Sequence, residues 1–196
     1  MNRCRAGVDE VGRGPLAGPV AVGVASVPKD FDWRKLNGVT DSKKLSEKKR
    51  EEIYKKARRL KAAGQIDFTV SMVSAGVIDK RGIVPAIELA LNRSLQRLGV
   101  EDTMDIKLDG GLKAPDNFKN QETVIKGDAK VKEIGLASIV AKVERDKYME
   151  RKSAEPIYAP YKWHENKGYG TKVHRAAIKK NGLTKLHRRT FCGNTH

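Results

Sequence analysis

The sequence predicts a single α/β domain built on a mixed β-sheet. Short valine-rich runs bounded by Gly or Pro alternate along the chain with longer segments that have the period of a helix. The 196 residues, of which 39% are hydrophobic, are enough for one core, and no repeat or long linker divides them. We therefore expect one domain over residues 1–196, with an α/β core to about residue 150 and a helical C-terminal segment over about 151–196.

The first half of the chain predicts three strands and one helix. Residues 3–9 and 19–28 have the composition of strands, and the short loop between them predicts an antiparallel pair. A helix is expected between Ser46, as its N-cap, and Gly64, which follows its last turn. Alternating apolar side chains then predict a half-buried strand over 65–73.

The second half predicts two further strands and three helices. A helix over about 84–98 precedes a short strand that ends at Asp109, and another strand ends near Asp128. A long patterned helix over 135–151 and a short one from 171 to about 181 follow. Helices between the later strands indicate a mixed sheet.

The formal net charge of +16 is the strongest compositional signal. An excess of this size typically serves a polyanionic partner, because Lys and Arg that neutralise phosphates release condensed counterions. Nucleic acid is therefore the favoured partner, and the alternative is a basic protein with no such ligand.

Two cysteines, Cys4 and Cys192, lie near opposite ends of the sequence. This spacing predicts neither a disulfide framework nor a metal site, so we interpret both as thiols in a reducing compartment. No apolar run of the sequence approaches the ~18 residues of a membrane span. The first residues turn polar by Asp9 and do not resemble a signal peptide, which predicts a cytoplasmic protein.

Four acids lie at the ends of predicted strands: Asp9, Glu10, Asp109 and Asp128. Neighbouring strand ends lie close together, so these carboxylates would gather at one place. Such carboxylates raise each other's pKa unless a cation lies among them, and oxygen ligands favour Mg²⁺ or Mn²⁺. On a basic protein this predicts two-metal phosphodiester cleavage, in which the ions activate water and stabilise the leaving 3′-oxygen. The alternative is that the acids cap turns or pair with the abundant Lys and Arg.

Asp9 and Glu10 are adjacent, and successive side chains of a regular strand point to opposite faces. Both carboxylates therefore cannot hold one ion in the same way. We expect Asp9 to be the central ligand, bridging both metals, and Glu10 to act through its backbone carbonyl or through water.

The loop that follows contains Gly12, Gly14 and Gly18. This spacing is one residue longer than the dinucleotide fingerprint G-x-G-x-x-G, and a strand rather than a helix comes next, so a nucleotide-binding loop is rejected. Glycines let the backbone approach a sugar closely, and the 2′-hydroxyl, both donor and acceptor, is the feature that marks RNA.

Taken together, these segments strongly resemble ribonuclease HII, the bacterial type 2 ribonuclease H family. The matching pieces occur in the family's order across almost the whole chain. They are GVDEVGRGPLAGPV (7–20), DSKKLS (41–46), LDG (108–110), KGD (126–128), ASIVAKVERD (137–146), KGYGTKVH (167–174) and HRRTF (187–191).

The resemblance implies an RNase H-like mixed sheet flanked by helices, with a helical C-terminal segment. It implies metal-dependent endonucleolytic hydrolysis of RNA in RNA–DNA hybrids, and cleavage 5′ of single ribonucleotides embedded in duplex DNA that leaves a 3′-hydroxyl and a 5′-phosphate. The cofactors would be two divalent cations, Mn²⁺ or Mg²⁺. The family's acidic quartet maps onto Asp9, Glu10, Asp109 and Asp128.

Substrate contacts also follow from the resemblance. The Gly-Arg-Gly tripeptide would read the 2′-hydroxyl at the RNA-to-DNA junction, and the tyrosine of KGYGT would stack beside the following deoxyribose and bond that hydroxyl. The two lysines of DSKKLS would contact phosphates, the alternative being a solvated start of a helix. These residues are Gly12, Arg13, Gly14, Tyr169, Lys43 and Lys44.

Other charged and aromatic residues leave alternatives open. Lys142 and Arg145 fit either a duplex contact or surface charge, and Asp146 fits an ion pair or an exposed position rather than a metal ligand. Tyr161 and Trp163 could stack on nucleic acid, but we expect them to pack under the C-terminal segment. His174 and His187 are expected to be structural or to contact phosphate rather than to act as a general base, because metals already activate the water.

Two rival functions are kept beside the leading one. A non-catalytic nucleic-acid-binding protein would need only the charge, and a type 1 ribonuclease H would not cut at a single embedded ribonucleotide. The expected partners are RNA–DNA hybrids and ribonucleotide-containing duplex DNA, with no membrane and no obligate protein partner. We expect a monomer, and the terminal RRTFCGNTH does not look like a replication-clamp peptide.

Overall fold

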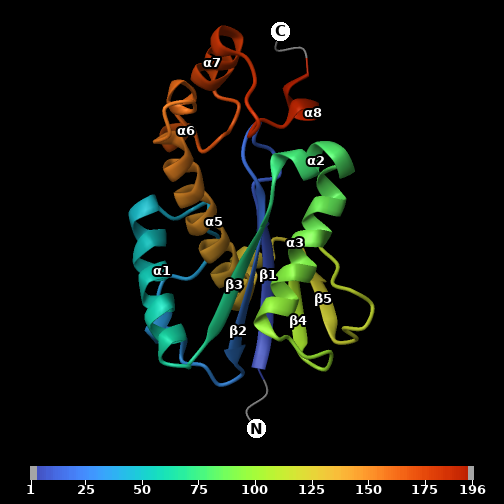
Figure 1. Ribbon diagram of the computed structural model, residues 1–196. Helices are drawn as coiled ribbons and strands as arrows, with labels where there is room; N and C mark the ends of the chain where they lie inside the picture. The colour runs from blue at the N-terminus through green and yellow to red at the C-terminus, as the bar shows by residue number, and fades with distance from the viewer. Residues whose placement is uncertain (1–3, 194–196) are drawn as a thin grey trace.

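A mixed five-stranded sheet forms the centre of the protein, whose computed structural model describes residues 4–193. The strands lie in the order β3-β2-β1-β4-β5 (Figure 1). β1 pairs antiparallel with β2, and β2 with β3, whereas the β1–β4 and β4–β5 pairs are parallel. The strands are β1 (Cys4–Val11), β2 (Val20–Pro28), β3 (Asp67–Val73), β4 (Asp105–Asp109) and β5 (Gln121–Val124).

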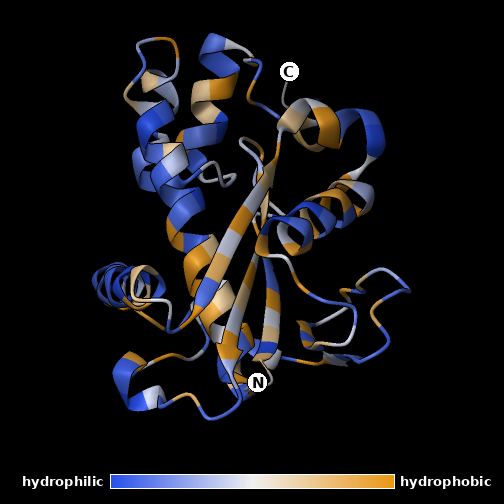
Figure 2. Ribbon diagram, turned by 60° about the horizontal axis from the view of Figure 1, so that its bottom comes forward, coloured by the Kyte–Doolittle hydropathy of each residue, from blue (hydrophilic) through white to orange (hydrophobic). Residues whose placement is uncertain are grey.

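Helices cover both faces of this sheet (Figure 1). On one face α1 (Glu47–Ala62) and α5 (Lys132–Ser153) share a buried apolar core with β2 and β3. On the other face α2 (Ala75–Arg81) and α3 (Ile83–Leu98) pack on β1, β2 and β4. Hydrophobic residues concentrate on the strands and on the helix faces toward them (Figure 2), and their burial is the main source of stability. Two short elements are η1 (Trp33–Leu36) and α4 (Gly127–Lys130).

Two glycines let α5 lie directly against the sheet. In β1, Val8 belongs to the core on the α3 side, so the adjacent Gly7 faces α5. A β-carbon on Gly7, or on Gly23 of β2, would overlap the backbone of α5. This close approach brings the side chains of α5 next to the part of β1 that carries Asp9.

The C-terminal segment packs beside one end of α5 and against the loop between β1 and β2 (Figure 1). The amide of Leu16 donates to the Gly168 carbonyl (2.9 Å), and the amide of Arg188 donates to the Leu16 carbonyl (2.8 Å). Tyr161 and Trp163 are buried in this segment, which confirms the packing predicted for them. Its elements are η2 (Ala159–Tyr161), α6 (Trp163–Asn166), α7 (Lys172–Asn181) and α8 (Arg189–Cys192).

The predicted elements are present, with differences at some boundaries. α1 begins after Ser46, whose side chain caps it, and Gly64 (φ 67°) follows its end as predicted. β1 continues to Val11 instead of ending at Asp9, because β2 pairs with it that far; the predicted first position, Arg3, lies outside the described residues. α2 was not predicted. None of the helices within residues 4–193 is long and apolar enough to span a membrane.

Candidate active site

Two carboxylates meet where β1 and β4 stop pairing with each other. Their parallel register ends at Val8↔Leu108, and the next residue of each strand is an aspartate, Asp9 and Asp109. Both aspartates lie on the sheet face opposite to Val8 and Leu108, which is the face covered by α5. Asp9 is 4% exposed and Asp109 is half-buried. The two acids lie together, as neighbouring strand ends predict.

Asp128 joins this pair from a short helix, so the prediction that it ends a strand is wrong. β5 stops earlier, and Lys126 (φ 55°) adopts a left-handed conformation that turns the chain into α4. The amide of Gly127 donates to Asp109 Oδ1 (2.6 Å) and fixes this turn against β4. One carboxylate oxygen from each of Asp9, Asp109 and Asp128 lies within 4.8 Å of the others.

Glu10 lies outside this cluster. It is the next residue of β1 and therefore points to the other face of the sheet. Its carboxylate accepts a hydrogen bond from Arg13 Nη1 (3.2 Å), and its amide donates to Asp9 Oδ1 (2.8 Å). The two adjacent acids thus have different surroundings, in line with the distinction drawn from strand alternation, and a contact of Glu10 with a metal stays a prediction.

Burial raises the pKa of three acids at this site. Burial raises the pKa of Asp9 to about 8; the charges of Glu10 and Asp109 add to the rise, and a hydrogen bond from Ser138 opposes it. Burial also raises the pKa of Glu10 and that of Asp128, for which Asp109 adds to the rise. A divalent cation would replace the proton that the buried Asp9 otherwise retains. Because every donor of the cluster is an oxygen, the site fits Mg²⁺ or Mn²⁺.

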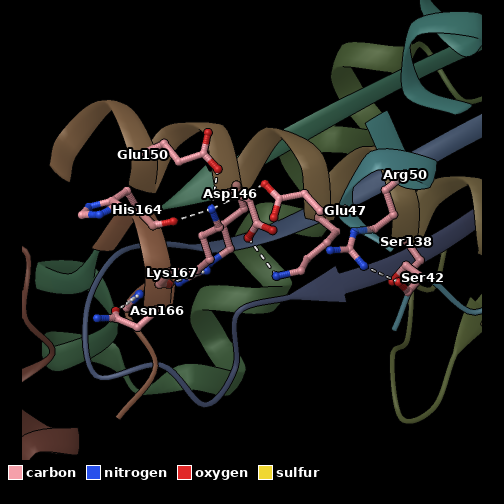
Figure 3. Close-up of polar contacts among 12 residues, drawn as sticks. Ser42, Glu47, Arg50, Ser138, Asp146, Glu150, His164, Asn166 and Lys167 are labelled. Atoms are coloured by element: carbon pink, nitrogen blue, oxygen red, sulfur yellow. Dashed lines mark hydrogen bonds and ion pairs between the residues drawn. The ribbon is translucent and has the colours of Figure 1, made fainter. Parts of the chain in front are cut away.

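A chain of polar residues lies behind Asp9. The Ser138 hydroxyl of α5 lowers the pKa of Asp9, and the Ser42 hydroxyl lies 2.7 Å from that of Ser138. Either serine hydroxyl can donate in this bond. Arg50 of α1 in turn donates to the Ser42 carbonyl (2.9 Å; Figure 3). Sequence reasoning missed these three residues, because serines in a loop and a helix carry no pattern that points to an acid elsewhere.

A pocket beside Asp9 collects most of the predicted substrate residues. Its lining includes the Gly-Arg-Gly loop, Lys43, Lys142 and Tyr169, besides Asp9 and Glu10. Tyr169 is 40% exposed, and the Lys142 ammonium lies 5.8 Å from the centre of its ring. Lys44 is exposed and does not line this pocket. Segments from both ends of the chain therefore form one site with the acids.

Two charged residues of α5, Arg145 and Asp146, are more buried than the sequence predicts. Arg145 is fully buried and donates to backbone carbonyls, so neither the duplex contact nor the surface charge predicted for it is right. Asp146 pairs with Lys142 one turn earlier (2.8 Å), which confirms the ion pair, but it is buried rather than exposed. α5 is covered on several sides by the sheet, α1 and the C-terminal segment, so position on this helix does not predict exposure.

His174 and His187 of the C-terminal segment are buried and structural. Trp163 Nε1 donates to His174 Nε2 (3.0 Å), and His187 Nε2 lies 3.2 Å from that same nitrogen. His174 Nδ1 lies 2.9 Å from the Tyr169 carbonyl, to which it donates. Burial lowers the pKa of both histidines, that of His187 to about 4. Because both are buried and hydrogen-bonded to protein atoms, the structural role fits them better than the phosphate contact, the other role predicted.

The fold and the acidic cluster define a class, the ribonuclease H-like nucleases. The chain is similar to the crystal structure of ribonuclease H2 from Pyrococcus horikoshii OT3, with a TM-score of 0.71 and 27% identity over 98% of this chain and 96% of that one. It is also similar to RNase HII from Archaeoglobus fulgidus, solved in complex with PCNA, with a TM-score of 0.74 and 26% identity over 94% and 93% of the two chains. Bst-RNase HIII, solved with Mn²⁺, shares the fold at 18% identity, with a TM-score of 0.71 over 99% of this chain and 68% of that one.

Sequence comparison narrows the class to one family. The family profile described as ribonuclease HII matches residues 6–194. Curated ribonuclease HII proteins are 42% identical in Endomicrobium trichonymphae, over 95% of this chain and 84% of that protein, and 44% identical in Parabacteroides distasonis, over 96% and 90%. The chain belongs to the ribonuclease HII family. It is therefore an endonuclease of the ribonuclease H class that acts on RNA–DNA hybrids, in a metal-dependent family.

Proposed function

We propose that the protein also nicks duplex DNA on the 5′ side of embedded ribonucleotides and leaves a 3′-hydroxyl and a 5′-phosphate. The observation that carries this proposal is that Asp9 belongs both to the acidic cluster and to the pocket that contains the Gly-Arg-Gly loop and Tyr169. A phosphate at the acids would therefore have its sugar beside that loop. Such nicking would begin the excision of ribonucleotides during DNA replication and repair.

The acidic cluster would hold the cations. Asp9, Asp109 and Asp128 offer carboxylate oxygens within 4.8 Å of one another, and Glu10 would act through its backbone carbonyl or through water. Two divalent cations, Mg²⁺ or Mn²⁺, supply when bound the positive charge that activates water and stabilises the leaving 3′-oxygen. Ser138, which lowers the pKa of Asp9, would help to orient its carboxylate.

The pocket would recognise the ribose. A β-carbon on Gly14 would meet no atom within 4 Å, so the space beside this residue is open to a substrate. The backbone of Gly12, Arg13 and Gly14 would bond the 2′-hydroxyl, which both donates and accepts. Tyr169 would stack beside the following deoxyribose. Lys43 in the pocket and Lys44 outside it would contact phosphates, to which a protein of charge +16 is attracted.

We propose that residues 1–196 form one domain whose two parts both contribute to the site. The core to about residue 150 would supply the acids, and the segment from about 151 to 196 would supply Tyr169 and support the substrate loop. A cytoplasmic location, a monomeric state and independence of a protein partner stay predictions from the sequence. The Archaeoglobus fulgidus relative was solved in complex with PCNA, so a sliding clamp is the first protein partner to test.

A duplex that carries one ribonucleotide, incubated with Mg²⁺ or Mn²⁺, tests the proposal. We expect a single nick on the 5′ side of the ribonucleotide, and we expect Asp9→Asn to abolish the nick while binding is retained. An all-DNA duplex controls for sugar dependence, and a long RNA–DNA hybrid controls for general activity. Cleavage of the hybrid without a nick in the first duplex would refute the proposal and indicate type 1 behaviour. An Asp9→Asn variant that nicks like the wild type would refute the role of Asp9.

A further inference from the structure

Two arginines that the proposed chemistry does not use are buried beneath the substrate loop. Arg145 of α5 and Arg188, which immediately precedes α8, are both 0% exposed. Within residues 4–193 neither forms a salt bridge with a carboxylate, and their N–H groups donate to backbone carbonyls instead. A buried cation is tolerated only when its donors are satisfied, so each guanidinium holds the carbonyls around it in fixed positions.

Arg188 holds the Gly-Arg-Gly loop from behind. Its Nη2 donates to the Gly12 carbonyl (2.7 Å), and its Nη1 donates to the Arg13 carbonyl (2.8 Å). Its Nε donates to the Gly18 carbonyl (3.0 Å), at the other end of the same loop. The planar guanidinium presents these donors in a rigid fork, so the three carbonyls are fixed relative to one another.

The direction of these carbonyls determines where the loop amides point. The carbonyl of one residue and the amide of the next belong to one planar trans peptide group and point in opposite directions. Since the carbonyls of Gly12 and Arg13 point at Arg188, the amides of Arg13 and Gly14 point away from it. Both Arg13 and Gly14 line the pocket, and neither amide donates to another residue of the described chain.

Arg145 extends this arrangement to the tyrosine of the pocket. Its guanidinium donates to the carbonyls of Pro19 (2.9 Å) and Lys167 (3.0 Å) and lies 5.9 Å from the ring centre of Tyr169. The two arginines thus connect the loop after β1 with the segment that carries the tyrosine. Burial lowers the pKa of Arg188 to about 9, with the charge of Arg145 adding to the effect, so Arg188 remains protonated at neutral pH.

We propose that Arg188 is a positioning residue for ribose recognition: by binding the carbonyls of Gly12 and Arg13, it directs the amides of Arg13 and Gly14 at the sugar beside the scissile phosphate. This inference rests on the proposed role of the Gly-Arg-Gly loop. Arg188 itself does not touch the substrate. It acts across 176 positions of the sequence, through the backbone of the loop.

Removal and chemical replacement of the guanidinium test this role. Arg188→Ala should lower kcat/KM on the single-ribonucleotide duplex by about 10- to 100-fold, as expected for lost charge-assisted hydrogen bonds. Millimolar guanidinium should restore part of this activity, and methylammonium should not, because only guanidinium reproduces the fork. The affinity for Mn²⁺ should be unchanged. Arg189→Ala, which removes the exposed neighbouring side chain, is the matched control and should show no rescue by guanidinium.

The stability of the variant is measured by thermal unfolding in parallel. A folded Arg188→Ala variant with wild-type kcat/KM, or one that guanidinium fails to rescue, would overturn the proposal. If this variant does not fold, Arg188→Lys decides, because it keeps the charge but cannot make three fixed bonds. The proposal requires Arg188→Lys to lose activity as well, and wild-type activity in that variant would contradict it.

Failure of the proposed function gives a different result. A wild-type protein that cuts the RNA–DNA hybrid but not the single-ribonucleotide duplex would refute the nicking proposal alone. The effect of Arg188→Ala and its rescue by guanidinium would then be measured on the hybrid, whose ribose must also lie beside the loop.

Discussion

The acidic cluster and the substrate loop are adjacent, but they are positioned by different means. Asp9 and Asp109 stand at matching points of two paired strands, so the backbone ladder alone brings them together. The Gly-Arg-Gly loop has no such partner strand and is held by the guanidinium of Arg188, near the other end of the chain. Sheet register therefore determines where Asp9 and Asp109 meet, and long-range side-chain contacts determine the position of the loop that we propose recognises the sugar.

The largest expected effect is a loss of metal affinity when an acid of the cluster is replaced. Asp109→Asn should lower the affinity for a first Mn²⁺ by more than about 100-fold, because loss of even an outer-shell partner of a metal costs about 10- to 100-fold. Glu10→Gln should lower this affinity less, because the Glu10 side chain lies outside the cluster and pairs with Arg13. Isothermal titration of the metal-free proteins with Mn²⁺ measures both affinities. Equal losses in the two variants would show that Glu10 is a full ligand of that ion.

The comparison also explains which parts could be predicted from the sequence. Asp9 and Asp109 follow valine- and leucine-containing strand patterns, and alternation within β1 already separated Asp9 from Glu10. Asp128 was placed on a strand because the run before it looks extended, whereas the left-handed turn at Lys126 depends on the bond from Gly127 to β4. That bond joins segments 18 positions apart and leaves no local pattern.

The remaining misses have the same cause. α2 is only 7 residues long, and its N-cap Ser74 makes no side-chain capping bond, so the usual helix-start signal is absent. Arg145 was expected at the surface or in contact with the substrate, because arginine side chains are mostly exposed. Its burial depends on carbonyls that Pro19 and Lys167 bring from opposite directions along the chain. Such a contact can be seen only after the fold is known.

Substitutions at two glycines of the loop should distinguish an effect on stability from an effect on substrate recognition. Gly12 has a φ of 92°, and a β-carbon there would overlap Arg145, so Gly12→Ala should destabilise the protein by at least about 2 kcal/mol. Gly14 has neither constraint, so Gly14→Ala should change stability by less than about 1 kcal/mol. The added methyl group would nevertheless occupy the space for the sugar and lower kcat/KM by about 10- to 100-fold.

Urea unfolding and cleavage of the single-ribonucleotide duplex measure the two quantities for each glycine variant. A Gly14→Ala variant with wild-type kcat/KM would mean that the sugar does not approach the loop at this residue. An unaltered stability of Gly12→Ala would mean that the loop can relax around Arg145, which would weaken the contrast between the two regions.

In the metal-free protein, the pH dependence of the free energy of unfolding reports on Asp9 of the acidic cluster and not on the loop. Folded Asp9 keeps its proton up to a pKa of about 8, whereas an unperturbed aspartate loses it near 3.8. Between these values the folded state binds more protons than the unfolded state, so the free energy of unfolding contributed by Asp9 falls as the pH rises. Asp9→Asn should remove this fall and be more stable than the wild type at pH near 8. Thermal unfolding in the presence of a chelator at several pH values measures the stability of both proteins. If their stabilities changed in parallel with pH, the raised pKa of Asp9 would be contradicted.

The smallest expected effect distinguishes two neighbouring lysines. Lys43 lines the pocket beside Asp9, whereas Lys44 is exposed outside it. If Lys43 neutralises a phosphate, Lys43→Ala should reduce the slope of log affinity against log salt by about 1, and Lys44→Ala should reduce it less. Binding to the uncleaved duplex is measured in the Asp9→Asn background, so that cleavage does not interfere. Equal slopes for the two variants would mean that the duplex extends beyond the pocket over the start of α1, and that the phosphate contacts are spread over the basic surface rather than confined to the site.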